Sequence, residues 1–347
     1  MKKLLLIFLS LTMLLIVSCD SSSDSSVNPM DEGKVYLING LGDFGTFSTI
    51  VDGVIENDVQ NVGKSPNDIQ INDGKVYVVN SGNSDVRYYN EEDLASMGAI
   101  QVTEGSNPSK CLVVDGKLYV SSLYGMGLEV YNLSDGQLIT TIGLNGGKSG
   151  ADVMALKDGF IYLNRNNYFF DKNGGHYLNE KILKIDTSSN TITDSVKVGV
   201  NVGDLLFDNS GKLHVLCSGN YGDIKGEINV VNPETMSVVH EINFDYQLSS
   251  LTKDNKGNIY TAKSDYDEAW NPESSIIKYH SMTYEVLVTA ENSFFTTSSG
   301  VLDMHFDKDT GKLYIPLFND NKVKVFENDT EIEEYQTGNG PQIVTSN

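Results

Sequence analysis

A short pattern of alternating apolar and polar positions recurs along the chain. Its clearest copy runs from Asn72 to Asn80, where an Asp-Gly turn precedes Lys-Val-Tyr-Val-Val and a polar stop. Copies of the same kind, each placed directly after a glycine, begin at Lys34, Lys75, Lys117, Phe160, Lys212, Asn258 and Lys312. A tight turn followed by period-two alternation predicts the second strand of a β-hairpin. The chain therefore contains seven copies of one hairpin unit.

The spacing of the copies predicts the architecture. Successive copies are 41, 42, 43, 52, 46 and 54 residues apart. Repeats of this length are typical of β-propeller blades, in which each unit is one four-stranded antiparallel sheet. In the clearest unit we expect the four strands at 66–72, 75–80, 85–89 and 99–103. The predicted fold is all-β, a seven-bladed β-propeller.

The two ends of the repeat region complement each other. The copy at Lys34 has no first strand before it, whereas residues 338–346 match a first strand with nothing after it. We therefore expect the C-terminal strand to pair into the N-terminal blade, so that one domain, residues 31–347, closes as a ring. Closure removes the free sheet edges that favour aggregation. Such a closed ring is expected to be monomeric.

The N-terminus has the pattern of an export signal. Lys2 and Lys3 precede an apolar run at residues 4–17, and Cys19 follows a small residue. This ending resembles the bacterial lipobox, which implies a signal peptide at 1–18, a lipid on Cys19 and a flexible Ser-rich tether at 19–30. An ordinary signal peptide or a single membrane anchor is the alternative, although the run is shorter than the ~20 residues a spanning helix needs. The expected location is the bacterial cell envelope, with the outer membrane or cell surface favoured.

Charge and cysteine content narrow the possible partners. The chain has 25 basic and 47 acidic residues, a net charge of −22. The globular part is therefore expected to repel nucleic acid and anionic lipid headgroups. Cys111 and Cys217 fall on strands two blades apart, so we expect buried free thiols rather than a disulfide.

The repeated strand resembles that of a known family. The Val-Tyr-Val-Val-Asn strand ending at Asn80, the prolines Pro66 and Pro108 before first strands, and the Asp-Gly turns are similar to the YVTN repeat of YncE-like propellers. The resemblance covers the chain after residue 30, although the blades containing Phe160, Lys212 and Asn258 lack the proline. It implies the fold, and it implies function only weakly. Lipid-anchored members of that family include surface proteins that capture cobalamin for an outer-membrane transporter.

The loops that follow the repeated strands differ from blade to blade. In a propeller these loops share one face with the connections between blades, and such loops commonly carry binding residues. Aromatic rings with amide groups suit a bulky planar or sugar-like ligand, because rings bury apolar area at low entropic cost and amides set orientation. Alternatively, the rings cover the tops of the blades. The predicted ligand-binding residues are Tyr124, Asn166, Tyr168, Asn220, Tyr221, Tyr266, Trp270, Phe318 and Asn319.

Acidic residues recur at the start of the first strands, near the predicted axis. Asp68, Asp152, Asp204 and Asp303 occupy near-equivalent positions, with Lys110 and Ser250 in two other blades. Carboxylates around one axis repel each other unless a cation or water lies between them. They are candidate ligands of a divalent cation in the axial funnel, and a solvated rim is the alternative. No other cofactor is predicted.

The sequence favours binding over catalysis. The five histidines are scattered, and no Ser/His/Asp spacing, His-Glu-x-x-His or Cys-x-x-Cys is present. The leading hypothesis is a non-catalytic, lipid-anchored envelope protein that captures a bulky ligand, corrinoid-like or glycan, or docks onto a membrane partner such as an outer-membrane transporter. A metal-dependent hydrolase or lactonase, or a quinone-dependent propeller enzyme, is the first alternative. A structural envelope scaffold is the second.

Overall fold

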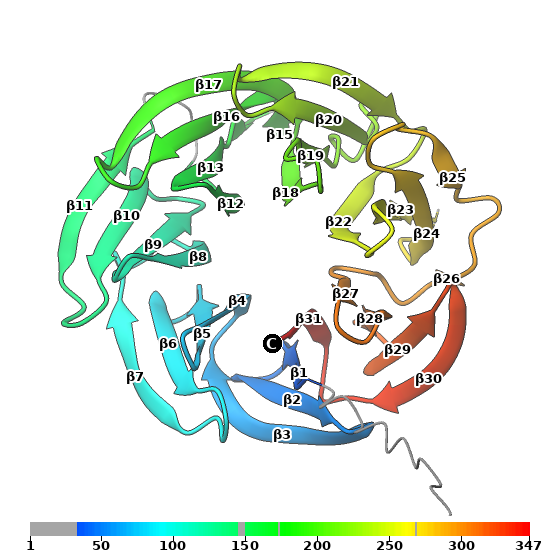
Figure 1. Ribbon diagram of the computed structural model, residues 1–347, viewed down its shortest axis with the longest axis horizontal. Helices are drawn as coiled ribbons and strands as arrows, with labels where there is room; N and C mark the ends of the chain where they lie inside the picture. The colour runs from blue at the N-terminus through cyan, green and yellow to red at the C-terminus, as the bar shows by residue number, and fades with distance from the viewer. Residues whose placement is uncertain (1–32, 145–149, 173, 268) are drawn as a thin grey trace, which may run out of the picture. The chain divides into compact units, whose positions relative to one another are not determined.

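The computed structural model describes residues 33–144, 150–172, 174–267 and 269–347, which belong to the compact unit Glu32–Asn347. Within these ranges no helix is long and apolar enough to cross a membrane. Seven antiparallel sheets of at least four strands follow one another around a ring (Figure 1). The predicted seven-bladed β-propeller is confirmed.

Each blade has the same strand order from the axis outward. The innermost strands are β31 (Pro341–Ser346), β4 (Pro66–Asn72), β8 (Pro108–Val114), β12 (Met154–Lys157), β18 (Val202–Phe207), β22 (Leu248–Lys253) and β27 (His305–Asp307). The second strands are β1 (Val35–Asn39), β5 (Lys75–Asn80), β9 (Lys117–Ser122), β13 (Phe160–Arg165), β19 (Leu213–Cys217), β23 (Asn258–Tyr266) and β28 (Lys312–Leu317).

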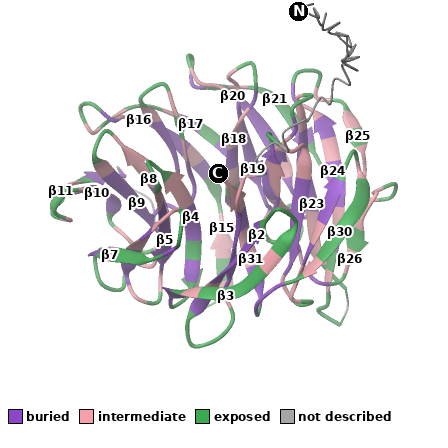
Figure 2. Cartoon of the chain, turned by 60° about the horizontal axis from the view of Figure 1, so that its bottom comes forward, coloured by how far each residue is buried: buried purple, intermediate pink, exposed green. Residues whose placement is uncertain are grey.

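The outer half of each blade is more exposed. The third strands are β2 (Gly45–Val51), β6 (Asp85–Asn90), β10 (Gly127–Asn132), β16 (Asn179–Asp186), β20 (Glu227–Asn232), β24 (Pro272–His280) and β29 (Lys322–Glu327). The outermost strands are β3 (Val54–Gly63), β7 (Ser96–Gln101), β11 (Leu138–Gly143), β17 (Thr191–Val200), β21 (Ser237–Asn243), β25 (Val286–Val288) and β30 (Thr330–Gln336). Burial decreases from the second strands to these outermost strands (Figure 2).

The C-terminal strand closes the ring by pairing into the N-terminal blade, as predicted from the sequence. β31 pairs antiparallel with β1, from Val35 opposite Ser346 to Asn39 opposite Pro341. Three N-terminal strands and one C-terminal strand thus form the first blade, in the order β3-β2-β1-β31. The strand expected at 99–103 instead spans Ser96–Gln101, because the preceding turn closes early, with Leu94 N–H donating to Asn90 O at 2.9 Å.

The second strands carry the core. In β1, Tyr36 and Ile38 pack against the second blade, while Val35 and Leu37 pack against the seventh. All five residues of β1 are buried, so the alternation of side chains serves two neighbouring sheets at once. Lysine and tyrosine at the start of these strands also reach the next blade, as where Tyr36 Oη donates to Glu91 O at 3.0 Å.

Because the strands alternate in direction, the connections divide between two ends of the ring. We call the end with the loops between second and third strands the loop face; it also carries the connections between blades. The opposite end, with the turns between first and second and between third and fourth strands, is the hairpin-turn face. The chain enters the ring at Lys34 on the hairpin-turn face, where Asn347 N–H donates to Lys34 O at 3.3 Å. The predicted signal peptide, Cys19 and tether lie outside the described residues.

Candidate functional site

The loop face brings part of the predicted aromatic set together. The insertion after β13 folds as a hairpin of β14 (Tyr168–Asp171) and β15 (Gly174–Tyr177). Within it the Tyr168 and Tyr177 rings lie 4.6 Å apart between centroids, and Tyr177 meets Tyr221 of the next blade edge-on at 6.0 Å. In the sixth blade Tyr266 and Trp270 lie 6.2 Å apart. Two aromatic groups on neighbouring blades therefore occupy this face.

Several of these rings are open to solvent. Trp270 is 81% exposed, Tyr124 68%, Tyr221 59% and Tyr266 50%, whereas Phe318 is half-buried. Tyr124 and Phe318 belong to the loops of the third and seventh blades, on either side of the two aromatic groups. Exposed large apolar side chains gathered on one face are typical of interaction surfaces.

Tyr177 was missed from sequence. The signal that could have found it is the Asn-Gly dipeptide at 173–174 with aromatic residues on both sides, which is a hairpin pattern. Tyr177 lies on the returning strand of this hairpin, β15.

The predicted amide groups are used mostly within the protein. Asn220 Oδ1 accepts from Gly222 N–H and Ile224 N–H, both at 2.9 Å, so its side chain shapes its own loop. Asn166 is only 6% exposed, and its amide lies 2.8 Å from the Asn164 amide. Asn319 is exposed, and its backbone N–H donates to Ser299 Oγ at 3.0 Å. Asn166 and Asn220 therefore support the loops that carry the aromatic rings.

A buried carboxyl lies beneath the hairpin insertion. Glu180, on β16, is 2% exposed, and Asn164 Nδ2 donates to its Oε2 at 2.9 Å. Burial raises the pKa of Glu180 from 4.5 to about 8, despite the opposing hydrogen bond from Asn164. Asn164 Oδ1 in turn accepts from Asp152 N–H and Val153 N–H at 2.8 and 2.9 Å. This network joins the base of the insertion to the innermost strand.

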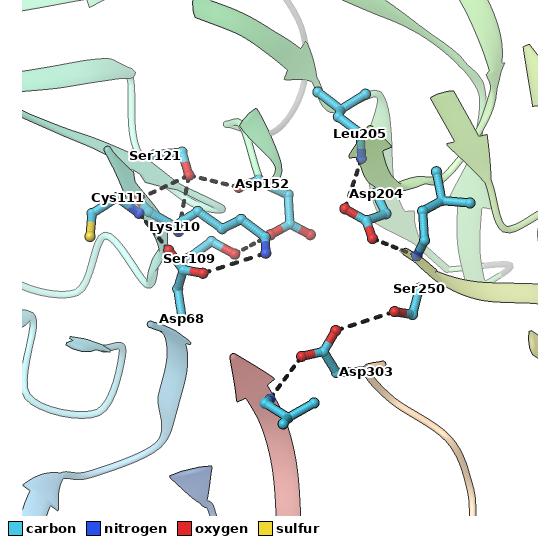
Figure 3. A network of polar contacts seen from close by, with 12 residues as sticks. Asp68, Ser109, Lys110, Cys111, Ser121, Asp152, Asp204, Leu205, Ser250 and Asp303 are labelled. Carbon is cyan, nitrogen blue, oxygen red and sulfur yellow. Dashed lines mark hydrogen bonds and ion pairs between the residues drawn. The ribbon is translucent and has the colours of Figure 1, made fainter. Parts of the chain in front are cut away.

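The axial aspartates join neighbouring blades (Figure 3). Asp68 accepts from the backbone N–H of Cys111 at 3.0 Å, Asp204 from that of Leu251 at 2.7 Å, and Asp303 from that of Val344 at 2.9 Å. Asp68 and Asp204 lie on innermost strands and Asp303 lies just before β27, and in each case the donor is on the innermost strand of the next blade. The pattern repeats because the innermost strands of successive blades lie side by side around the axis.

Asp152 and Ser250 depart from this pattern. Asp152 precedes β12, and its Oδ1 contacts Ser109 Oγ of the preceding blade. Ser250 stands where other blades have an aspartate. Its Oγ accepts a hydrogen bond from Met304 N–H at 3.1 Å and lies 3.2 Å from Asp303 Oδ1. Figure 3 shows Asp152 beside Lys110, and Asp204 across the axis with Ser250 and Asp303.

Lys110 supplies a positive charge among the carboxylates. Its Nζ lies 3.5 Å from Asp68 Oδ1, and the pKa of Lys110 is raised first by Asp68 and further by Asp204, Asp303 and Asp152. Burial raises the pKa of Asp68, Asp204 and Asp303, the last to about 6, and Lys110 opposes this rise. Within the described ranges no group of three His, Cys, Asp or Glu side chains is placed to hold a metal ion. The predicted divalent cation stays a prediction, and a lysine of the chain itself already neutralises part of this charge.

Two cavities lie away from the aromatic loops. One, of about 690 Å³, extends from Asp68, Lys110, Asp204 and Asp303 along the axis to turns of the hairpin-turn face, where Asn255 and Lys308 line it. The other, of about 330 Å³, lies between the sixth and seventh blades beside Tyr260, Lys278 and Asp329. None of the nine predicted ligand-binding residues lines either cavity.

Cys111 and Cys217 are buried free thiols, as predicted. Burial raises the pKa of both thiols well above the usual range, which disfavours the reactive thiolate. His214, which occupies the position of the repeated tyrosine, is buried between Tyr279 Oη at 3.0 Å and Asp208 Oδ2 at 3.3 Å. These polar groups pack between blades.

The comparisons with known proteins identify a class of fold. No profile of a known family matches the chain, and no curated protein matches it significantly. Among solved structures, the computationally designed Ika8 protein is similar with a TM-score of 0.60 and 12% identity, over 90% of this chain and 89% of its own. Hydrazine synthase of Kuenenia stuttgartiensis is similar with a TM-score of 0.61 and 14% identity, over 78% of this chain and 85% of its own. At these identities the likeness shows the shared propeller fold alone.

Replacing Lys110 should expose the mutual repulsion of the axial carboxylates. We expect Lys110→Met to lower the free energy of unfolding at pH 7.5 by about 2 kcal/mol, less than the ~3–5 kcal/mol of a fully buried broken pair, because the lysine side chain keeps 34% of its surface exposed. The pKa values of the aspartates should rise further, so the native state binds more protons than the unfolded chain and stability falls more steeply from pH 5 to 8. Urea unfolding at several pH values measures both effects.

The matched control is Lys308→Met. Lys308 borders the same cavity but is 75% exposed and pairs with Asp309, so its loss should change stability by less than about 0.5 kcal/mol. Equal effects of the two substitutions at every pH would show that Lys110 is not the counterion of the axial carboxylates.

Glu180 should make the protein less stable in alkaline solution. Its folded pKa of about 8 exceeds the unfolded value of 4.5, so the native state holds an extra proton between these values. Stability is therefore expected to fall as pH rises from about 4.5 to 8, by an amount on the order of a few kcal/mol. Glu180→Gln should flatten this part of the profile, whereas Glu273→Gln, at a 53% exposed carboxylate, should not. Melting temperatures from pH 4 to 9 test this, and parallel profiles for wild type and Glu180→Gln would refute it.

Proposed function

We propose that this protein is a non-catalytic binding protein of a bacterial cell envelope, anchored by a lipid on Cys19, that holds a bulky ligand on its loop face. The observation that carries the proposal is the exposure of Tyr221, Tyr266 and Trp270 together on that face. Exposing such rings to water gives the folded chain no packing benefit, whereas a ligand would cover them.

The axial region gives less support to an enzyme. The carboxylates that suggested a metal-dependent hydrolase or a quinone-dependent enzyme accept hydrogen bonds from neighbouring blades and face Lys110. Their positions are accounted for by the joining of blades, so no observation favours catalysis over binding. A purely structural scaffold would not need a set of exposed aromatic residues on the loop face.

The entry point of the chain supports capture of a soluble ligand. A lipid anchor on Cys19 would join the ring through Lys34, which lies on the hairpin-turn face opposite the aromatic loops. The loop face would then be free to meet molecules from the medium. The resemblance to YVTN-repeat propellers makes a corrinoid one candidate, with a glycan as the other, and docking onto an outer-membrane transporter is a further use of the same face.

The loop-face assignment predicts a triple variant that no longer binds. We expect one of three probe sets (cobalamin and its precursors, haem or oligosaccharides) to raise the melting temperature of the full chain in detergent, because a ligand at 100 times its Kd adds about 2.7 kcal/mol of stability. Replacing Tyr168, Tyr221 and Trp270 together by Ala should abolish that shift. The control replaces three exposed aliphatic residues of outermost strands, Val54, Leu138 and Val239, by Ala. A shift of wild-type size in the aromatic variant would exclude the loop face.

If Cys19 carries a lipid, replacing its sulfur by oxygen should change where the protein is found in the envelope. Cys19→Ser removes the thiol that would receive the lipid, so the protein should move from the membrane fraction to the soluble fraction of the envelope and lose labelling by a radioactive fatty acid. Cys111→Ser and Cys217→Ser, at buried thiols, should leave both fractionation and labelling unchanged. Unaltered membrane association of Cys19→Ser would point to an uncleaved membrane anchor instead.

A further inference from the structure

Five bulky residues of the described chain have a backbone conformation that normally requires glycine, asparagine or aspartate. They have positive φ in the left-handed region: Leu94 (57°), Tyr221 (57°), Met236 (44°), Trp270 (64°) and Tyr284 (62°). For bulky side chains this conformation is an uncommon and strained one. Each of the five positions therefore needs a compensating benefit.

Three of the five gain that benefit from burial. Leu94, Met236 and Tyr284 occupy equivalent turns between third and fourth strands, each on the hairpin-turn face. Leu94 and Met236 are 4% and 6% exposed within cores between blades, and Tyr284 packs partly buried against His240, with ring centroids 4.2 Å apart. Packing explains the side chains at these turns.

Tyr221 and Trp270 gain much less from burial, because they are 59% and 81% exposed and each has one ring contact, with Tyr177 and Tyr266 respectively. Side-chain hydrogen bonds also stabilise the backbone on either side of both residues. Asn220 caps the turn containing Tyr221, and Asp267 Oδ1 accepts from Ala269 N–H and Asn271 N–H, both at 2.8 Å, around Trp270. The chain thus holds two exposed aromatic residues in a strained conformation that Asn or Gly would adopt more easily. Strain of this kind is typical of ligand-contacting positions.

We propose that Tyr221 and Trp270 are stacking platforms for a neutral oligosaccharide, on neighbouring blades of the loop face. This assignment rests on the proposed function and adds the class of ligand. Rings held in one orientation lose little entropy on binding, and the apolar face of a pyranose ring matches an exposed indole or phenol.

Charge around the platforms selects a neutral ligand. The loop-face segments of the same two blades contain Asp223, Asp245, Asp265, Asp267 and Glu273, against Lys225 and Lys263, and Lys263 Nζ lies 2.9 Å from Glu273 Oε2. Hydrogen bonds from neighbouring amides lower the pKa of Asp223 and Asp267, which keeps both carboxylates ionised. Anionic ligands, such as sulfated glycans or haem with its carboxylates, are disfavoured by this surface. Sugar hydroxyls, by contrast, can donate hydrogen bonds to carboxylates.

Trp270 allows a direct test, because it is the only tryptophan of the chain. Its fluorescence in the full-length protein in detergent is measured while neutral oligosaccharides (cello-, xylo-, manno- and malto-oligosaccharides) are added, with heparin, haem and cobalamin as comparison probes. We expect a neutral oligosaccharide to shift the emission to shorter wavelength. The anionic probes should leave it unchanged.

Variants separate binding from folding. Tyr221→Asn and Trp270→Asn relieve the strained conformation, so the melting temperature should stay the same or rise. The affinity for the oligosaccharide should fall about tenfold or more. Calorimetry measures the affinity of both variants, and fluorescence measures that of Tyr221→Asn, which keeps the tryptophan. The same change at Leu94, which is buried, and at Tyr284, which is partly buried, should lower the melting temperature and leave the affinity unchanged.

The outcomes distinguish the class of ligand from the proposed function. Binding of cobalamin or haem alone, with loss of affinity in Tyr221→Asn, would overturn the glycan assignment and leave the loop face as the binding site. Unchanged affinity for a neutral oligosaccharide in both variants would overturn the platforms. Absence of any emission change with every neutral probe would also overturn the assignment, and retained binding by the triple alanine variant would overturn the proposed function itself.

Discussion

The structure depends on burial of each second strand between two neighbouring blades. A four-stranded sheet with one buried face and one wet face cannot account for a strand such as β1, in which all five residues are buried. Each such strand gives alternate side chains to the blade before and the blade after, so no blade has a complete core of its own. Pairing of β31 with β1 is therefore a condition of stability for the whole ring, because it gives the first and last blades their missing neighbours.

The same constraint explains the polar groups at the axis. Where innermost strands converge, backbone N–H groups need acceptors that are not supplied by their own sheet. Asp68, Asp204 and Asp303 supply them across the gap between blades, and Lys110 reduces the electrostatic cost of gathering these carboxylates. A set of residues that resembles a metal site in sequence thus has a structural use, which follows from the geometry of a ring of strands.

The fold could be predicted almost fully from the sequence, since the repeated strand is a packing requirement that each blade must meet in the same way. Prediction of the candidate site went less far, because it depends on how unlike loops fold. Asn166 and Asn220 look like free amides in sequence, yet one is buried beside Asn164 and the other caps its own turn. The outermost strand begins at Ser96, earlier than expected, because Leu94 adopts a left-handed turn conformation that a leucine in the sequence does not predict. For the same reason the conformations of Tyr221 and Trp270 could not be predicted, because they depend on hydrogen bonds that Asn220 Oδ1 and Asp267 Oδ1 accept from backbone N–H groups several residues on.

The distribution of strain separates the scaffold from the site. On the hairpin-turn face, a bulky residue in a left-handed turn inserts into the adjoining core, so local strain is offset by burial and the position resembles its counterparts in other blades. On the loop face, Tyr221 and Trp270 have the same strained conformation, which is stabilised by polar side chains that contribute nothing to the core. A chain selected only for stability would place Asn or Gly at those two turns, as it does at many others in this ring. The retained aromatic side chains therefore mark where folding and function make different demands on the same backbone.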